Sequence, residues 1–319
     1  WVDQTMIESA ELLSKGDIAT CVIQYGRFPS FLSVQKVALG RHQFRALLWS
    51  VRQRLAERPA AQRPNVLVFG ESLGAWASSD VVMYQGIEGF DHYGIDKALW
   101  VGLPGLAKWS RNGMAAGSSD LVPAGSVGVF DNPAEIESLT EEERTRLRAA
   151  VLSHDNDPIA VMSPDILVRE PEWLSGERGR NVPEDMDYTP FSTFLQVAFD
   201  AMNAKVTVPG PFGSFGHDYR ADMARMVRAA CGFDDITNEQ IDAIEQQLVT
   251  LELERAERIN ASIAEDAPAS PQYRGTDLAD EITGRMVTQA GVPLQAGRTS
   301  GPEWFKAVTG ADAGPEDVQ

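Results

Sequence analysis

Short runs of apolar residues alternate with stretches of helical periodicity through most of this chain. Such runs occupy residues 18–23, 66–69, 98–101 and 149–152, and residues 206–208 form a fifth, shorter one. A strand that is apolar at consecutive positions buries both of its faces. Strands of this kind, separated by helices, predict an α/β fold in which helices cover both faces of a mostly parallel sheet.

The helices are predicted from apolar residues at helical spacing and from the glycines that end them. In the first helix Met6, Ala10 and Leu13 share one face, and Gly16 stops the helix. Helices are expected on these grounds over residues 3–14, 35–56, 189–204 and 219–230.

Composition excludes several classes of function. The chain has 319 residues, enough for a sizeable core, and carries 28 Lys and Arg against 46 Asp and Glu. Its net charge of −18 argues against binding nucleic acid through phosphate contacts. No stretch approaches the roughly eighteen apolar residues of a membrane-spanning helix. Cys21 and Cys231 have no near neighbours of a zinc site, so no metal or cofactor is expected, and Cys21 is predicted to be buried.

The charge shifts toward the C-terminus. Residues 234–319 hold 17 acidic and 6 basic side chains, whereas the rest of the chain is much closer to neutrality. This shift divides the chain into a main domain over residues 1–233 and an acidic extension over residues 234–319. Apolar positions at helical spacing predict a helix over residues 237–259, which either docks on the main domain or binds a protein partner or a second copy. Residues 260–319 are expected to be a flexible tail.

The pentapeptide G-E-S-L-G at residues 70–74 is the sharpest chemical signal. It follows the apolar run 66–69 directly and precedes a helix start. A strand, a tight turn and a helix around G-x-S-x-G form a nucleophile elbow, which holds its serine in a strained conformation at the helix N-terminus. The two glycines are expected to let strand and helix pack closely. Ser72 is therefore predicted to be a nucleophile rather than an ordinary turn serine.

Four histidines are candidates for the base that such a serine needs. His42 lies in a charged helix and His92 in a polar loop, and both are expected to face solvent. His154 follows a strand but lies only three residues before the expected acid. His217 lies in a glycine-rich loop after the last expected strand, and the chain order Ser, Asp, His is that of an α/β-hydrolase. His217 is the predicted base.

The orienting carboxylate is expected in a loop at the end of the strand at residues 149–152. Asp157 lies there, before a Pro-Ile pair, where it could accept from the histidine ring and fix its tautomer. Asp155, Asp165 and Asp131 are the alternatives, each of which could equally be an ordinary turn aspartate.

The oxyanion hole is predicted to take one donor from the backbone N–H of Leu73, the residue after the nucleophile. Residues 18–23 precede the helix that leads to the serine strand, so they correspond to the fourth strand of such a fold. The first strands and the second oxyanion donor are then expected at or before Trp1. A substrate pocket is predicted from apolar residues that could equally be core packing, namely Phe28, Phe31, Leu32, Leu103, Trp109 and Trp173.

Several separated segments together resemble a group of actinobacterial α/β-hydrolases. They are residues 22–25 with 28–33, 69–74, 98–102, 157–159 with 163–165, and 216–217 with Tyr219. The resemblance covers about residues 1–232 and leaves out the acidic extension. Members of that group usually carry a multi-pass membrane domain upstream of the hydrolase domain. The resemblance therefore implies serine-esterase chemistry and membrane association through a segment before Trp1, on an unspecified side of the membrane.

Three functions fit these residues. The first is a serine hydrolase that cleaves an ester, of a lipid or another acylated substrate, through a Ser-His-Asp triad and an acyl-enzyme. The second is an acyltransferase, which would pass the same acyl group to another alcohol. The third is a non-catalytic scaffold or binding module in which the acidic extension is the working part.

Overall fold

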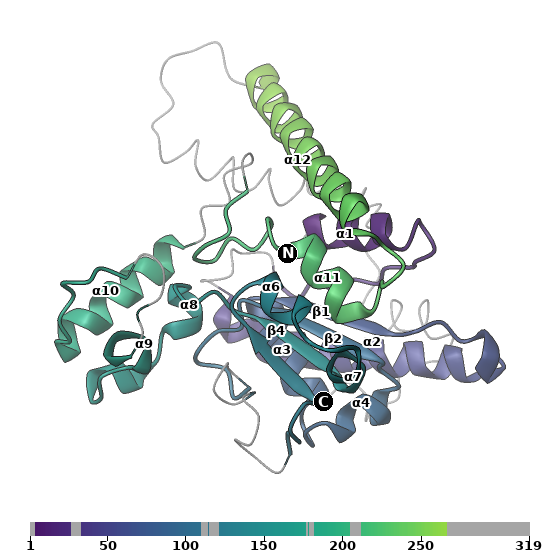
Figure 1. The fold of residues 1–319 in the computed structure, drawn as a ribbon, viewed down its shortest axis with the longest axis horizontal. Helices are drawn as coiled ribbons and strands as arrows, with labels where there is room; N and C mark the ends of the chain where they lie inside the picture. The colour runs from purple at the N-terminus through teal and green to yellow at the C-terminus, as the bar shows by residue number, and fades with distance from the viewer. Residues whose placement is uncertain are drawn as a thin grey trace.

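The predicted α/β architecture is confirmed by a computed structural model. It describes residues 4–26, 33–109, 114, 121–176, 178, 182–204 and 212–266, the side chains of residues 260 and 262–266 excepted. Four parallel strands form a sheet in the order β1-β2-β4-β3 (Figure 1). The strands are β1 (Leu67–Glu71), β2 (Lys97–Val101), β3 (Val127–Phe130) and β4 (Ala149–Leu152).

Both faces of the sheet are buried, which explains why its strands are apolar at nearly every position. Ala98 and Trp100 of β2 belong to one apolar cluster, and the alternate residues Leu99 and Val101 belong to the other. The first cluster includes residues of α2 (Val37–Ala56), α3 (Leu73–Val82) and α4 (Glu88–Tyr93). The second includes residues of α1 (Gln4–Leu13), α6 (Pro133–Glu137), α11 (Met223–Cys231) and α12 (Asn238–Asp266).

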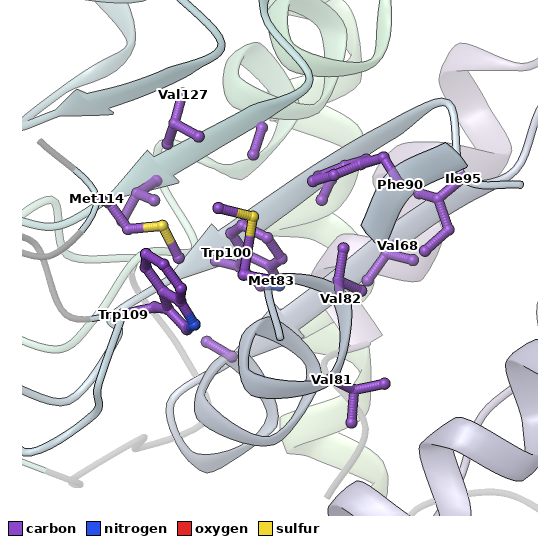
Figure 2. Packing of buried hydrophobic residues seen from close by; sticks show 14 of the residues in the cluster. Val68, Val81, Val82, Met83, Phe90, Ile95, Trp100, Trp109, Met114 and Val127 are labelled. Atoms are coloured by element: carbon purple, nitrogen blue, oxygen red, sulfur yellow. The ribbon is translucent and has the colours of Figure 1, made fainter. Parts of the chain in front are cut away.

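Among the described residues, Trp100 is the largest fully buried side chain. Its ring lies among Met83, Phe90 and Trp109 (Figure 2). The indole Nε1–H donates to Ser78 Oγ at 3.0 Å, so this buried donor is not left without a partner. Because Ser78 belongs to α3, the bond also ties that helix to β2.

Residues 18–23, predicted to be a buried strand, are not a strand in the structure. Ile18 and Val22 are 36% and 50% exposed, and Cys21 is exposed, so its predicted burial is wrong. Among the described residues no strand pairs with this run, and β1 forms that edge of the sheet. An apolar run can form a buried strand only where a neighbouring strand completes its backbone hydrogen bonds.

The other elements follow the predictions with shifted ends. Helices α1, α2 and α10 (Pro190–Asn203) lie where expected. Helix α11 begins four residues later than expected, because residues 220–222 form a turn. The side chains of Tyr219, Arg220 and Asp222 take part in the site described below. Helix α12 runs past residue 259 to Asp266. Residues 260–266 belong to α12, so the predicted flexible tail is wrong for them. Residues 206–208 and 267–319 lie outside the described residues, so the fifth strand and the rest of the tail stay predictions.

A helical excursion separates β4 from α11. It lies to one side of the sheet (Figure 1), and α10 packs there on α8 and η4. Its short elements are α8 (Pro158–Val161), η4 (Pro164–Leu167) and α9 (Glu172–Ser175). The remaining short helices are η2 (Val34–Lys36), η3 (Ala60–Gln62) and α7 (Glu141–Arg146). Within the described ranges, no helix combines the length and the hydropathy that crossing a membrane requires.

Candidate active site

Ser72 occupies a strained turn between β1 and α3. Its backbone has φ 52° and ψ −120°, a combination that non-glycine residues rarely adopt. The Ser72 N–H donates to the carbonyl of Val101 at 2.9 Å, so the strained residue continues the ladder between β1 and β2 by one position. Helix α3 starts at the next residue. The local structure is the strand, tight turn and helix that the sequence predicts.

The two glycines around Ser72 differ in what they allow. A Cβ on Gly70 would lie 2.6 Å from Ser78 Oγ, 2.7 Å from the carbonyl of Gly74 and 2.8 Å from Ala75 Cα. Close packing of strand on helix therefore requires a glycine at position 70. A Cβ on Gly74 would meet no described atom within 4 Å. The expectation that both glycines serve this packing is right for the first and wrong for the second.

His217 and Asp157, 60 residues apart in sequence, contact each other in a buried position. His217 Nδ1 lies 2.7 Å from Asp157 Oδ2. The other oxygen, Oδ1, accepts from the N–H of Ile159 at 2.8 Å, because Asp157 is also the N-cap of α8. An ionised carboxylate can only accept, so Nδ1 carries the hydrogen of this contact, and in the neutral ring Nε2 has a lone pair that can accept a proton.

Tyr219 completes the surroundings of Asp157. Its hydroxyl donates to Asp157 Oδ2 at 2.5 Å and accepts from the backbone N–H of His154 at 3.2 Å. Burial and then the negative charge of Asp157 raise the pKa of Tyr219 well above its usual value, so the hydroxyl remains a donor. The Tyr219 ring meets the ring of His217 edge-on, with centroids 5.6 Å apart. Sequence reasoning gave Tyr219 no role, although its place two residues after His217 was a usable signal.

Ser72 and His217 both lie against the carboxyl end of β2. Gly102, the residue after Val101, has φ +57°, and a Cβ there would lie 2.6 Å from His217 Cε1. Val101 in turn accepts the N–H of Ser72. The Ser72 hydroxyl forms no hydrogen bond with a described residue. Bonds between nucleophile and base are often long in the absence of substrate and shorten when it binds.

His154 holds the loop before His217 rather than acting at the reaction centre. Its Nδ1 lies 2.8 Å from the carbonyl of Gly216, and its Nε2 lies 2.8 Å from Asp222 Oδ2. The carbonyl of Gly216 can only accept, so His154 Nδ1 donates to it. From the other side, the N–H of Gly216 donates to Asn156 Oδ1 at 2.8 Å. The peptide units around Gly216 are therefore held at both ends.

The remaining candidates lie elsewhere. His42 is exposed as expected, and His92 is exposed as well but belongs to α4 rather than to a polar loop. Asp165 is exposed on η4, whereas Asp131 and Asp155 are half-buried at the ends of β3 and β4. The carboxylate that contacts the His217 ring is the one favoured from sequence.

Leu73, the predicted oxyanion residue, is the first residue of α3 and is buried. Its side chain packs with Val37, and Tyr25 packs against the same cluster. Burial raises the pKa of Tyr25 to about 12, so its hydroxyl stays protonated. Trp1, where a second donor is expected, lies outside the described residues.

The predicted pocket residues fall into two groups. Phe28, Phe31 and Leu32 lie outside the described residues. Leu103 and Trp109 are 1% and 4% exposed and belong to the core cluster around Trp100, so for these two residues the alternative of core packing is confirmed. Trp173 is half-buried in α9.

Comparison with known protein families gives a match over most of the chain. A model described as an alpha/beta-hydrolase family covers residues 1–244. The matched region includes the turn at Ser72, the loop with Asp157 and the loop with His217, and it ends inside α12. Neither the curated proteins nor the solved structures give a match.

Proposed function

Because this chain belongs to an alpha/beta-hydrolase family, we propose that it is a serine hydrolase that cleaves an ester. Family membership supports hydrolase chemistry in general. The observation that carries the narrower proposal is the 2.7 Å contact of His217 Nδ1 with Asp157, beside the strand end to which the Ser72 turn is bonded. A buried pair of this kind leaves Nε2 as a base where the serine is presented.

The proposed reaction begins when Ser72 Oγ attacks the acyl carbonyl and His217 Nε2 takes the hydroxyl proton. Asp157 accepts from Nδ1–H and stabilises the imidazolium. The negative charge on the carbonyl oxygen develops near the N–H of Leu73, at the positive end of α3. His217 then returns its proton to the leaving alcohol. Water, deprotonated by His217, attacks the acyl-enzyme and releases the acid and free Ser72.

We further propose that the ester carries an apolar acyl group, as in a lipid or another acylated molecule. The support lies on α10, where Phe191, Phe199 and Met202 are 67%, 58% and 64% exposed. Their spacing places them on one face of that helix. Helix α10 packs on α8, whose N-cap is Asp157, so the helix that carries this apolar face is connected to a loop of the proposed site. Association with a membrane stays a proposal of the same kind.

A fluorophosphonate probe tests the proposal, because it forms a covalent bond only with an activated serine. We expect the full chain to be labelled at Ser72, and Ser72→Ala and His217→Ala to remain unlabelled while keeping the wild-type circular dichroism spectrum. Absence of labelling in folded wild-type protein, or labelling that persists in Ser72→Ala, would contradict it.

The acyl preference and the fate of the acyl group can be read with p-nitrophenyl esters. We expect kcat/KM to increase from acetate to medium-chain esters, and the released acyl group to appear as free acid. Addition of acceptor alcohols distinguishes the acyltransferase, since a transferase would form the new ester in preference to the acid.

A further inference from the structure

Asp218, the residue after His217, closes the loop that carries the proposed base. Its carboxylate accepts from the N–H of Gly213 at 3.0 Å. Arg220 grips both carboxylate oxygens, with Nε 2.9 Å from Oδ1 and Nη2 2.7 Å from Oδ2. Two parallel charge-assisted bonds of this kind fix orientation as well as distance. The His217 loop therefore depends on where the Arg220 guanidinium is held.

Arg220 is held in turn by a residue of α12. Its Nη1 donates to Glu252 Oε1 at 3.0 Å, and its guanidinium lies 5.0 Å from the centroid of the Phe212 ring. The side chains of Arg220 and Glu252 are each only 10% exposed. Charges in such a place are screened little by water and salt, and leaving one of them without its partner is costly.

Glu252 is itself fixed in position. Its second oxygen, Oε2, accepts from Arg255 Nη1, and Arg255 Nη2 donates to Glu8 on α1. One turn before Glu252, Leu248 is 1% exposed in the core. The carboxylate that reaches Arg220 thus comes from a helix segment that is docked by both apolar and ionic contacts.

We propose that Glu252 is a positioning residue for the active site, which fixes the His217 loop through Arg220 and Asp218. The inference rests on the proposed function and extends the working part of the molecule to α12 beyond residue 244, where the family match ends. The physical reason is that a base displaced by a fraction of an ångström loses much of its effect. Without Glu252, the Nη1 end of the guanidinium loses its buried anion, and the orientation of the Arg220–Asp218 pair loses one of its constraints.

The test compares Glu252→Gln with Glu254→Gln in the full chain. Glu254 lies on the same helix but is exposed, and it meets Arg258 only at 3.8 Å, so it is a matched control. In Glu252→Gln we expect hydrogen exchange at the Gly213 amide to rise about ten-fold or more. We expect kcat for a p-nitrophenyl ester to fall about ten-fold while KM changes less than about two-fold. Glu254→Gln should leave all three quantities at wild-type values.

The two readouts separate this inference from the proposed function. If wild-type protein is active and Glu252→Gln changes neither kcat nor exchange at Gly213, the positioning role is wrong and the proposed function stands. If exchange rises but the folded wild type hydrolyses no ester and takes no fluorophosphonate, the support of the loop stands and the proposed function fails. A fall in stability alone would raise exchange in α3 by the same factor as at Gly213, so a larger rise at Gly213 than in α3 is part of the expected result.

A second variant covers the case in which Glu252→Gln does not fold. Arg220→Lys keeps one positive charge, but an ammonium group cannot bind both oxygens of Asp218 in a fork and reach Glu252 as well. We expect the same fall in kcat and the same rise in exchange at Gly213. Wild-type values of both in Arg220→Lys would overturn the inference.

Discussion

At the scale of single residues, Asp157 is held by three donors from two parts of the chain. They are the N–H of Ile159, the ring of His217 and the hydroxyl of Tyr219. A fully buried carboxylate needs such donors to remain ionised, and three of them leave it little freedom to turn. The orientation of His217 is therefore set by the surroundings of its acid as much as by the acid itself.

Replacing Tyr219 by Phe tests this arrangement. The change removes one donor to Asp157 and leaves the buried N–H of His154 without its acceptor. We expect the free energy of unfolding in urea to fall by about 1–3 kcal/mol, because an unsatisfied buried group keeps its desolvation cost. Tyr93→Phe is the control, since Tyr93 is also buried but its hydroxyl bonds no described residue. Equal losses of unfolding free energy in Tyr219→Phe and Tyr93→Phe would show that the hydrogen bonds of Tyr219 do not contribute to stability.

Gly102 and Gly94 separate a steric effect on His217 from backbone strain. Both have positive φ, 57° and 70°, but a Cβ on Gly94 would meet no described atom within 4 Å. Alanine at either position should cost about 1 kcal/mol of unfolding free energy for the left-handed backbone. Only Gly102→Ala collides with the His217 ring, so we expect its kcat to fall about 100-fold while Gly94→Ala stays active. Thermal melting measures the loss of stability, and ester hydrolysis measures kcat. Equal kcat in Gly102→Ala and Gly94→Ala would refute the steric explanation.

At the scale of elements, sequence patterns located three of the four strands because β1, β2 and β4 are continuous apolar runs. The patterns were wrong where the structure of a segment depends on whether a neighbouring strand pairs with it. Residues 18–23 have the same composition as a buried strand, yet they lie exposed because no described strand pairs with them. The V-G-V-F segment of β3 was missed because it is short and contains a glycine.

The candidate site divides in the same way. Ser72, Asp157 and His217 could be chosen from a motif, its flanking elements and the order of residues along the chain. The contacts of His154 with Asp222 and of Arg220 with Glu252 could not, because they join side chains 68 and 32 residues apart that share no local pattern. A polar run such as residues 153–157 indicates that its side chains form hydrogen bonds, but it does not indicate with which residues.

The packing of β1 on α3 gives a prediction at this scale. Gly70→Ala places a methyl group 2.7–2.8 Å from backbone atoms of Gly74 and Ala75, which cannot move without shifting the helix. We expect the variant to lose labelling at Ser72 and to unfold at least about 2 kcal/mol more easily. Gly74→Ala should instead be neutral, or stabilising by up to about 1 kcal/mol, because its Cβ meets no described atom and alanine favours helix. Urea unfolding of both variants measures these changes. A larger loss of unfolding free energy in Gly74→Ala than in Gly70→Ala would contradict the conclusion that Gly70 is the glycine required for packing.

At the scale of the whole molecule, the two halves of the proposed machinery come from opposite faces of the sheet. Ser72 directly precedes α3, which packs with α2 and α4, whereas the His217 loop leads into α11 on the face covered by α1 and α12 (Figure 1). Both lie at the carboxyl end of β2. The geometry of the site therefore requires that the helices on both faces stay packed on the sheet. On the face that carries α11, the ion pairs of Asp218, Arg220 and Glu252 join the His217 loop to α12.

That chain of charges gives stability a pH dependence in the acid range. Burial alone would raise the pKa of Asp218, but the hydrogen bonds from Arg220 and from the N–H of Gly213 outweigh it and hold the pKa below the usual 3.8. A carboxyl group whose pKa is lower in the folded state stabilises the fold above its unfolded pKa. This contribution is lost as the pH falls through the folded pKa. We therefore expect full stabilisation by Asp218 above about pH 5 and its progressive loss below about pH 4.

Urea unfolding at a series of pH values from about 3 to 7 checks this expectation. Asp218→Asn should be less stable than wild type at neutral pH, because Arg220 loses its anion. In acid, the slope of its unfolding free energy against pH should be smaller than that of wild type, by the equivalent of up to about one bound proton. Asp235 provides the contrast: a hydrogen bond from Lys15 lowers its pKa too, but both side chains are more than 60% exposed, so Asp235→Asn should change the curve little. If Asp218→Asn and wild type lose stability with the same slope, the buried charges between loop and helix do not govern the acid response, and the coupling of α12 to the site is weaker than its geometry suggests.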